Sequence, residues 1–124
     1  MSKLVLFLIA CSVMLSSVAQ ILLKRGMSNP AVLNVLNSGS TLDIIKEVST
    51  NVFVFGGLFL YFASAAVWLL VLAKTDVSTA YPFVGVGFVV TMLLAFAING
   101  ETLTIAKVTG TLLIALGVAV IARG

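Results

Sequence analysis

The first apolar stretch of the chain carries polar side chains at every fourth position. Ser12, Ser16, Gln20 and Lys24 follow this spacing, which brings side chains close to one face of a helix. With Arg25 beside Lys24, these groups could bind a ligand that carries hydroxyls and a negative charge, because Lys and Arg are the natural partners of phosphate. The same residue types also serve helix packing in membranes, where small hydroxyl residues allow close approach and glutamine bonds a neighbouring helix. The spacing alone leaves both interpretations open.

A second candidate face combines aromatic rings with a hydroxyl. Tyr61, Ser64 and Trp68 stand at positions i, i+3 and i+7 of another apolar stretch, which is again one face of a helix. Aromatic faces can stack on sugar rings or flat ligands, and they can equally fill the space between helices. An aromatic belt at the membrane surface does not account for Tyr61 and Ser64, which lie near the middle of the stretch. Tyr81 adds a further ring at the start of the next stretch.

Ionisable groups are absent from the interior of all the apolar stretches. Intramembrane carboxylates are the usual groups for proton coupling and for recognising cations, so their absence disfavours a proton-coupled carrier of cationic drugs. The chain also has no histidine and a single cysteine, which excludes a Cys/His metal site, a disulfide framework and a Cys–His nucleophile. The sequence therefore predicts neither an enzyme nor a protein with a metal or another cofactor.

The composition places these residues in a membrane protein. Hydrophobic residues make up 61% of the 124 residues and charged residues 9%, whereas a soluble domain is about 45–50% apolar and about 25% charged. This balance excludes a soluble enzyme and a disordered chain. The net charge of +3 comes from scattered Lys and Arg residues without interleaved aromatics, so nucleic acid is not an expected partner.

Three uncharged stretches are long enough to cross a membrane as helices, and a fourth, 108–122, extends back to Thr104 because Lys107 can snorkel to the surface. A helix needs about 20 residues to span a hydrocarbon core of about 30 Å, and no strand-like alternation indicates a barrel. The short links between the later stretches make neighbouring helices antiparallel. We therefore predict an all-α, polytopic membrane protein formed by a single domain of residues 1–124. The predicted transmembrane helices cover residues 4–23, 52–73, 77–98 and 104–122.

Residues 24–51 form the one long connection. Two short helices are predicted to start at Pro30 and Thr41, capped by Asn29 and Ser40. The second of them has an apolar stripe opposite charged residues, which is typical of a helix that lies at the level of the lipid headgroups. Alternatively, this segment gates a portal that faces the lipid.

The last two spans carry start signals of their own. Ser78 or Thr79 is predicted to cap the third helix, which would place Pro82 in a first turn, where its missing N–H costs little. Thr102 or Thr104 is predicted to cap the fourth helix after a tight turn.

Several short motifs resemble the small multidrug resistance family and its relatives in the drug/metabolite transporter superfamily. In chain order they are Leu23-Lys24-Arg25-Gly26, Tyr61-x-Ala63-Ser64, Leu72-Ala73, Ala80-Tyr81, Gly85-Val86-Gly87 and the run from Gly110 to Val118. Ser16 stands where the multidrug exporters carry a membrane glutamate. Ala80-Tyr81-Pro82 and Gly100-Glu101-Thr102-Leu103 look more like the short subunits proposed to flip undecaprenyl-phosphate aminoarabinose. The resemblance implies a paired four-helix transporter of the bacterial inner membrane and argues against proton/drug exchange.

The size of the chain and its charge distribution predict the assembly. Four helices cannot enclose a path for a polar solute, so we expect a dimer in which the first three helices of each copy line a cavity. The fourth helix would hold the dimer through Gly110, Ile114 and Gly117, because small residues let membrane helices pack closely. Lys and Arg number three on the side of the termini and four on the other, which gives almost no preferred orientation. We predict an antiparallel homodimer, with a heteromer of similar subunits or a parallel dimer as alternatives.

The preferred function is the flipping of an anionic isoprenoid-phosphate-linked sugar, or a related lipid, across the inner membrane. The alternatives are a pump for small hydrophobic or cationic compounds and an accessory subunit without transport activity. We expect Lys24, with Arg25 nearby, to bind the phosphate, and transport to run downhill because the sequence offers no ATP site and no ionisable coupling group. The headgroup cavity is predicted to be lined by Ser16, Gln20, Tyr61, Ser64, Trp68 and Tyr81.

Overall fold

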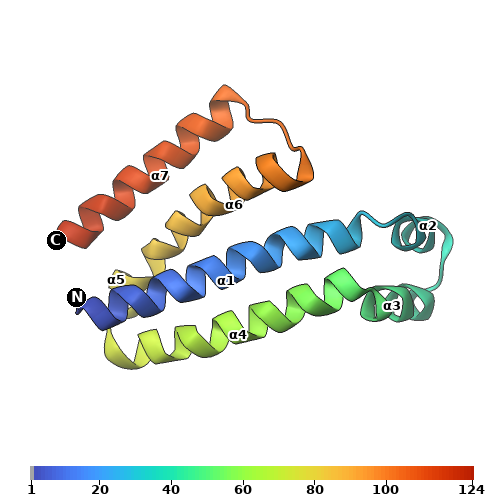
Figure 1. Ribbon diagram of the computed structural model, residues 1–124, viewed down its shortest axis with the longest axis horizontal. Helices are drawn as coiled ribbons and strands as arrows, with labels where there is room; N and C mark the ends of the chain where they lie inside the picture. The colour runs from blue at the N-terminus through green and yellow to red at the C-terminus, as the bar shows by residue number, and fades with distance from the viewer. Residues whose placement is uncertain (1) are drawn as a thin grey trace.

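The computed structural model describes residues 2–124, and every regular element in that range is helical (Figure 1). Four helical segments are long and apolar enough to cross a membrane, which confirms the predicted all-α fold with four transmembrane helices. The third of these consists of α5 (Val77–Ala80), the 3-10 helix η1 (Tyr81–Phe83) and α6 (Val84–Asn99). The other three spans are α1 (Lys3–Met27), α4 (Val52–Lys74) and α7 (Ile105–Arg123).

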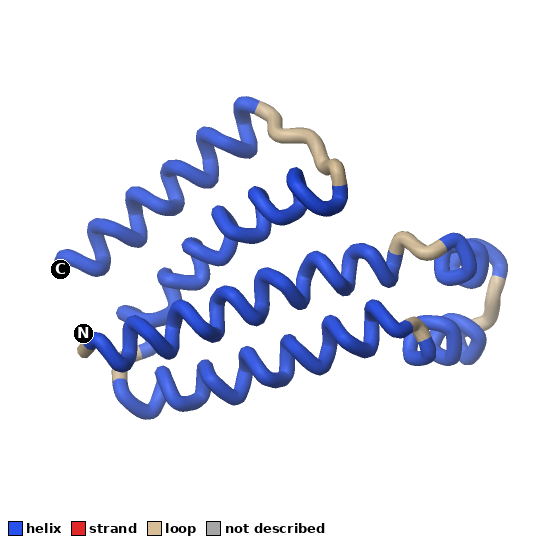
Figure 2. The backbone as a smooth tube through the Cα atoms, viewed as in Figure 1, coloured by secondary structure: helices blue, strands red, loops and turns tan. Residues whose placement is uncertain are grey.

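The four spans lie in a row. α1 packs along α4 on one side and along α6 on the other, and α7 packs mainly against α6. Successive spans run in opposite directions, so both termini lie at the same end of the molecule (Figure 1). We call this the terminal end, and the opposite end, with the α1–α2 and α6–α7 connections, the loop end. The pair of α6 and α7 diverges from α1 and α4 toward the loop end (Figure 2).

α1 is longer than predicted because no residue breaks it before the proline that follows. Ser2 caps its start, where Oγ accepts the N–H of Val5 at 3.2 Å. The helix continues through Lys24 and Arg25 in its last turn, a position where cations interact favourably with the negative end of the helix. Pro30 cannot continue a helix and begins the next one instead.

The connection after α1 folds into the two predicted short helices, α2 (Pro30–Ser38) and α3 (Thr41–Thr50). Asn29 and Ser40 cap them as predicted, and their side chains accept first-turn N–H groups at 2.9 and 3.3 Å. Both helices lie beyond the loop ends of α1 and α4 (Figure 1). The residues of α3 are exposed or half-buried, and Leu42 on its apolar stripe is 74% exposed. This exposure suits a helix at the level of the headgroups.

The third span begins at the predicted residue, but its cap differs from the prediction. The helix begins at Val77 with Asp76 at the N-cap position, so a cap at Ser78 or Thr79 was the wrong expectation. Asp is itself a preferred residue at this position. Pro82 therefore stands inside the span, where it lacks the N–H that a continuing α-helix needs. The backbone tightens into η1 before α6 resumes regular geometry, so the span is interrupted close to the terminal end.

The turn between α6 and α7 depends on one glycine. Gly100 has a φ of 68°, in the left-handed region that glycine adopts without a steric penalty. This conformation ends α6 and brings the N–H of Glu101 to the carbonyl of Ala95 at 3.2 Å. Thr104 then caps α7, because its Oγ1 accepts the N–H of Lys107 at 3.1 Å. One of the two predicted caps is thereby confirmed.

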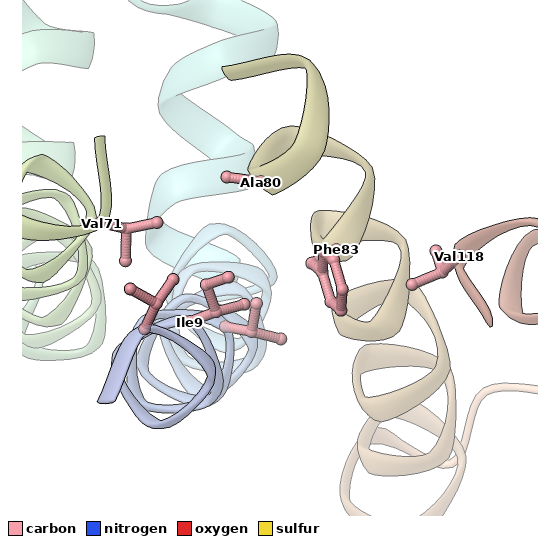
Figure 3. Packing of buried hydrophobic residues seen from close by; sticks show 7 residues of the cluster. Ile9, Val71, Ala80, Phe83 and Val118 are labelled. Carbon is pink, nitrogen blue, oxygen red and sulfur yellow. The ribbon is translucent and has the colours of Figure 1, made fainter. Parts of the chain in front are cut away.

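The main apolar core lies at the terminal end. It joins the first half of α1, the end of α4, the region of η1 and the second half of α7, and Trp68 packs against it. Ile9 lies between Val71 and Phe83 (Figure 3). All four spans therefore meet at this end. The buried core residues are Val5, Ile9, Val13, Val71, Ala80, Phe83 and Val118.

Candidate functional site

A cavity with many polar lining residues occupies the other half of the molecule. Its volume of about 520 Å³ falls in the range of about 300–1,000 Å³ that is typical of small-molecule sites. α1, α6 and α7 supply most of its lining, α4 contributes Tyr61, and the cavity reaches the α6–α7 connection at the loop end. Within residues 2–124, none of its lining residues comes from α2 or α3, the two helices for which gating was the alternative interpretation. The lining residues are Ser16, Ser17, Gln20, Tyr61, Val84, Gly87, Phe88, Thr91, Met92, Ala95, Glu101, Thr102, Leu103, Lys107 and Thr111.

Ser16, Gln20 and Tyr61, all predicted to contact the headgroup, line this cavity. Ser16 Oγ donates to the carbonyl of Val13 on its own helix at 3.0 Å, which leaves the oxygen lone pairs free to accept. Gln20 and Tyr61 are exposed, and their amide and phenol groups can both donate and accept hydrogen bonds. The structure thus brings together three groups that could bond the hydroxyls of a sugar.

Ser64 lies outside the cavity, in the contact between α1 and α4. Its Oγ donates to the carbonyl of Ser12 at 2.8 Å, and Ser12 Oγ donates to the carbonyl of Ser64 at 2.9 Å. Both residues are buried. Each four-residue step turns an α-helix by about 40°, so Ser12 and Gln20 point in directions about 80° apart. The polar residues of α1 therefore divide between helix packing at Ser12 and the cavity at Ser16 and Gln20.

Trp68 and Tyr81 lie at the terminal end, away from the cavity. Their ring centroids are 6.3 Å apart with an interplanar angle of 74°, the edge-to-face arrangement that aromatic pairs favour. Trp68 packs against the apolar core, whereas Tyr81 is 62% exposed. In this chain the two rings therefore contact each other at the end opposite to Gln20.

The two cations predicted to bind phosphate lie at the loop end, beyond the residues that line the cavity. Lys24 is exposed. Arg25 Nη2 donates to the carbonyl of Ile98 at 3.2 Å, and its Nε donates to Asn99 Oδ1 at 3.4 Å. A cation in this place interacts favourably with the negative end of α6. Arg25 therefore joins α1 to α6, and Lys24 is the cation of this pair that remains open to a ligand.

The cavity is also lined by residues that the sequence did not lead us to assign to the site. Ser17 Oγ donates to the backbone of α6 at 3.3 Å, while Thr91 and Thr111 supply hydroxyl groups from α6 and α7. Glu101 and Lys107 place charges of both signs on the lining. A threonine inside a long apolar helix was a signal that could have pointed to Thr91 and Thr111. Glu101 was noted only as part of a family motif.

The residues of α7 predicted to form a dimer interface differ in their surroundings. Among the described residues, none comes within 4 Å of a Cβ built on Gly110 or Gly117, so both glycines have open space beside them. Ile114 packs within the chain, because its Cγ2 would lie 2.6 Å from a Cβ built on Gly85 of α6. Gly85 thus allows α7 to approach α6 at this position.

Four apolar spans, with a cavity lined by polar and apolar residues, define a small multi-pass membrane protein. Comparison with known proteins makes the assignment specific. The chain is 32% identical over 112 residues to the probable 4-amino-4-deoxy-L-arabinose-phosphoundecaprenol flippase subunit ArnF of Serratia proteamaculans, covering 88% of this chain and 85% of the relative. It is 34% identical to the corresponding subunit of Proteus mirabilis over 90% of this chain and 86% of that one.

A multidrug resistance protein is also similar. The chain is 36% identical over 85 residues to EbrB of Bacillus atrophaeus, covering 67% of this chain and 73% of EbrB. No family model and no solved structure matches the chain. The chain belongs to the family of the ArnF flippase subunits, related to small multidrug resistance proteins, as its motifs indicated. It is a multi-pass protein of the bacterial inner membrane.

Proposed function

We propose that this chain is a subunit of a flippase that moves an anionic isoprenoid-phosphate-linked sugar across the inner membrane, and that it is not an enzyme. Its relatives are named as flippase subunits for 4-amino-4-deoxy-L-arabinose-phosphoundecaprenol, a lipid of this class. The observation that carries the proposal is the cavity of about 520 Å³ with hydroxyl and amide groups on its lining. The spans contain no carboxylate, and among residues 2–124 the one carboxylate on the cavity lining, that of Glu101, lies on the α6–α7 connection at the loop end.

The headgroup would occupy the cavity while the isoprenoid tail stays in the lipid. Ser16, Gln20 and Tyr61 would bond the sugar hydroxyls, since all three line the same space. We propose that Lys107 binds the phosphate inside the cavity, and that Lys24, exposed at the same end, attracts the phosphate toward it. Ammonium groups are natural phosphate partners, and they act there as point charges.

The cavity of one chain reaches the loop end, whereas the apolar core fills the terminal end. A headgroup that crosses the membrane must be accessible from both faces in turn. A second subunit in the opposite orientation would have its own cavity open to the other face of the membrane. We therefore propose that an antiparallel second copy, or a similar subunit, completes the transporter, and that Gly110, Ile114 and Gly117 lie where α7 meets this partner.

The test is transport of a labelled polyprenyl-phosphate sugar in liposomes that contain the full chain. We expect downhill movement that a protonophore does not stop. Lys107→Met is expected to slow it about tenfold or more, because a hydrogen bond to a charged group contributes about 1.5–3 kcal/mol. Lys24→Met should have a smaller effect. Lys46→Met, on α3 and away from the cavity, is the matched control and should transport at the normal rate.

Export of small hydrophobic or cationic compounds is the second candidate, and the similarity to EbrB favours it. The variant Ser16→Glu introduces the membrane carboxylate that such exporters carry. It should repel the phosphate lipid and bind a cationic dye. If the unmodified chain moves the dye and leaves the lipid in place, or if a protonophore stops transport, export is the function and the flippase proposal is wrong.

A further inference from the structure

We propose that Glu101 and Lys107 recognise a headgroup that carries both charges, with Lys107 binding the phosphate and Glu101 binding an amine on the sugar. This inference rests on the proposed function and assigns one residue to each of the two charged groups that the relatives' named substrate carries, a phosphate and a sugar amine. Both residues line the same cavity at the loop end. Glu101 would then determine which sugar is accepted.

Lys107 is held at the cavity by a backbone contact. Its Nζ donates to the carbonyl of Thr102 at 3.0 Å, which uses one of the three donors of an ammonium group and leaves two for a ligand. The residue lies in the first turn of α7, which Thr104 caps. A cation is unfavourable beside the positive end of a helix, whereas an anion is favourable there. The position of Lys107 therefore does not stabilise α7, and it suits a site that binds a phosphate together with the helix end.

Glu101 is held by its backbone and leaves its side chain unengaged. It follows Gly100, whose left-handed conformation directs the N–H of Glu101 to the carbonyl of Ala95. In residues 2–124, no hydrogen bond or ion pair engages the Glu101 carboxylate. The two opposite charges thus share one cavity without neutralising each other. Two side chains joined in an ion pair would have to separate before either could bind a ligand. Glu101 and Lys107 are not joined in this way, so both charges are available.

The two charges lie near each other, as the phosphate and the sugar amine do in such a lipid. Lys107 belongs to α7, but its ammonium group reaches back to the carbonyl of Thr102, the residue that follows Glu101. In an isoprenoid-phosphate sugar the phosphate is attached to the tail, and the sugar with its amine lies beyond it. An ammonium group next to Glu101 gains a charge-assisted contact, and a neutral acylated amine loses that contact. The preference for the free amine over the acylated amine is set by the difference between their two binding free energies.

The experiment compares two labelled polyprenyl-phosphate sugars in the same liposomes, one with a free amine and one with that amine acetylated. The full chain is expected to move the free amine about tenfold faster at limiting substrate, the low end for a charge-assisted contact at an exposed site. Glu101→Gln should bring this ratio close to one, and Glu101→Asp should retain most of the preference. Asp43→Asn removes a carboxylate from α3, outside the cavity, and should keep the ratio of the unmodified chain.

The outcomes separate this inference from the proposed function. If the full chain moves neither lipid, the proposed function is wrong. If it moves the lipids but shows no preference for the amine, or if Glu101→Gln keeps the preference, the flippase function stands and the role of Glu101 is refuted. Lys107→Met should slow both lipids alike, and a loss confined to the amine-bearing lipid would contradict the assignment of the phosphate to Lys107.

Discussion

The terminal end and the loop end are built differently from the same four spans. At the terminal end, buried apolar side chains from every span contact one another. At the loop end, α1 and α4 remain packed together, but α6 and α7 diverge from them and border a cavity of about 520 Å³ (Figure 2). Helices in lipid associate through close packing and hydrogen bonds, because lipid tails are as apolar as the side chains. The buried cluster to which all four spans contribute therefore lies at one end, and space for a ligand lies at the other.

The largest expected effect compares one phenylalanine from each end. Phe83 is 8% exposed in the terminal core, whereas Phe88 borders the cavity and is 53% exposed. Phe83→Ala should lower the free energy of unfolding by about 3–5 kcal/mol, the cost of such a truncation in a packed core. Phe88→Ala should cost far less. Titration with sodium dodecyl sulfate in mixed micelles, followed by circular dichroism, measures both. Equal losses would contradict the contrast between the ends.

A smaller effect is expected at a glycine that lets α7 approach α6. A Cβ on Gly85 would lie 2.6 Å from Ile114 Cγ2 and 3.1 Å from Val118 Cγ2. Gly85→Val should therefore force the helices apart and cost about 1–3 kcal/mol, as overpacking commonly does. The matched variant Gly117→Val adds a side chain where the chain has open space, and it should leave the unfolding of a single chain nearly unchanged.

Gly117→Val also tests the predicted contact between copies. If α7 meets its partner at this glycine, the larger side chain should reduce the fraction of cross-linked pairs, although a single chain unfolds as before. Cross-linking in liposomes, followed by gel electrophoresis, measures this fraction. Unchanged pairing in both Gly117→Val and Gly110→Val would place the interface elsewhere.

The smallest expected effect lies between the two ends, where α1 and α4 exchange hydrogen bonds. Ser12→Ala, Ser64→Ala and the double variant form a thermodynamic cycle for the reciprocal contacts at 2.9 and 2.8 Å. The coupling should be about 0.6 kcal/mol and no more than about 1.7, the range found for hydrogen bonds between membrane helices. Ser16→Ala, on the cavity side of α1, should show no coupling with Ser64→Ala. A strong coupling there would mean that the polar residues of α1 act as one group.

The fold was predictable where a signal is local to the sequence. Uncharged stretches of sufficient length specify the spans, and Asn29, Ser40 and Thr104 specify helix starts because each side chain bonds an N–H only two or three residues away. The interruption at Pro82 was misjudged for a related reason. The helix begins at Val77, in agreement with the predicted bounds, but Asp76 rather than Ser78 or Thr79 stands at the N-cap position, so Pro82 falls beyond the first turn.

The candidate site was predictable only in part because its residues come from separate helices. Gln20 and Tyr61 were expected in the cavity, but Ser64 was assigned there from its spacing to Tyr61 and instead bonds Ser12. Spacing along one helix gives the relative direction of side chains, and it does not tell which neighbour occupies each direction. The charged residues Glu101 and Lys107 lie near the end of a span, where sequence alone reads them as ordinary flanking charges.

The break at Pro82 has a mechanical consequence for the two helices that follow it. α6 contains 16 residues and is therefore about 24 Å long, and α7 packs against it. A rotation of about 10° at η1 would swing the far end of this arm by about 4 Å, in the manner of a hinge. Points beside a hinge hardly move, and Phe83 and Val118 of the core lie beside this one. The cavity can thus widen by several ångströms while the terminal core stays in place, once the bonds from Arg25 to Ile98 and Asn99 have broken.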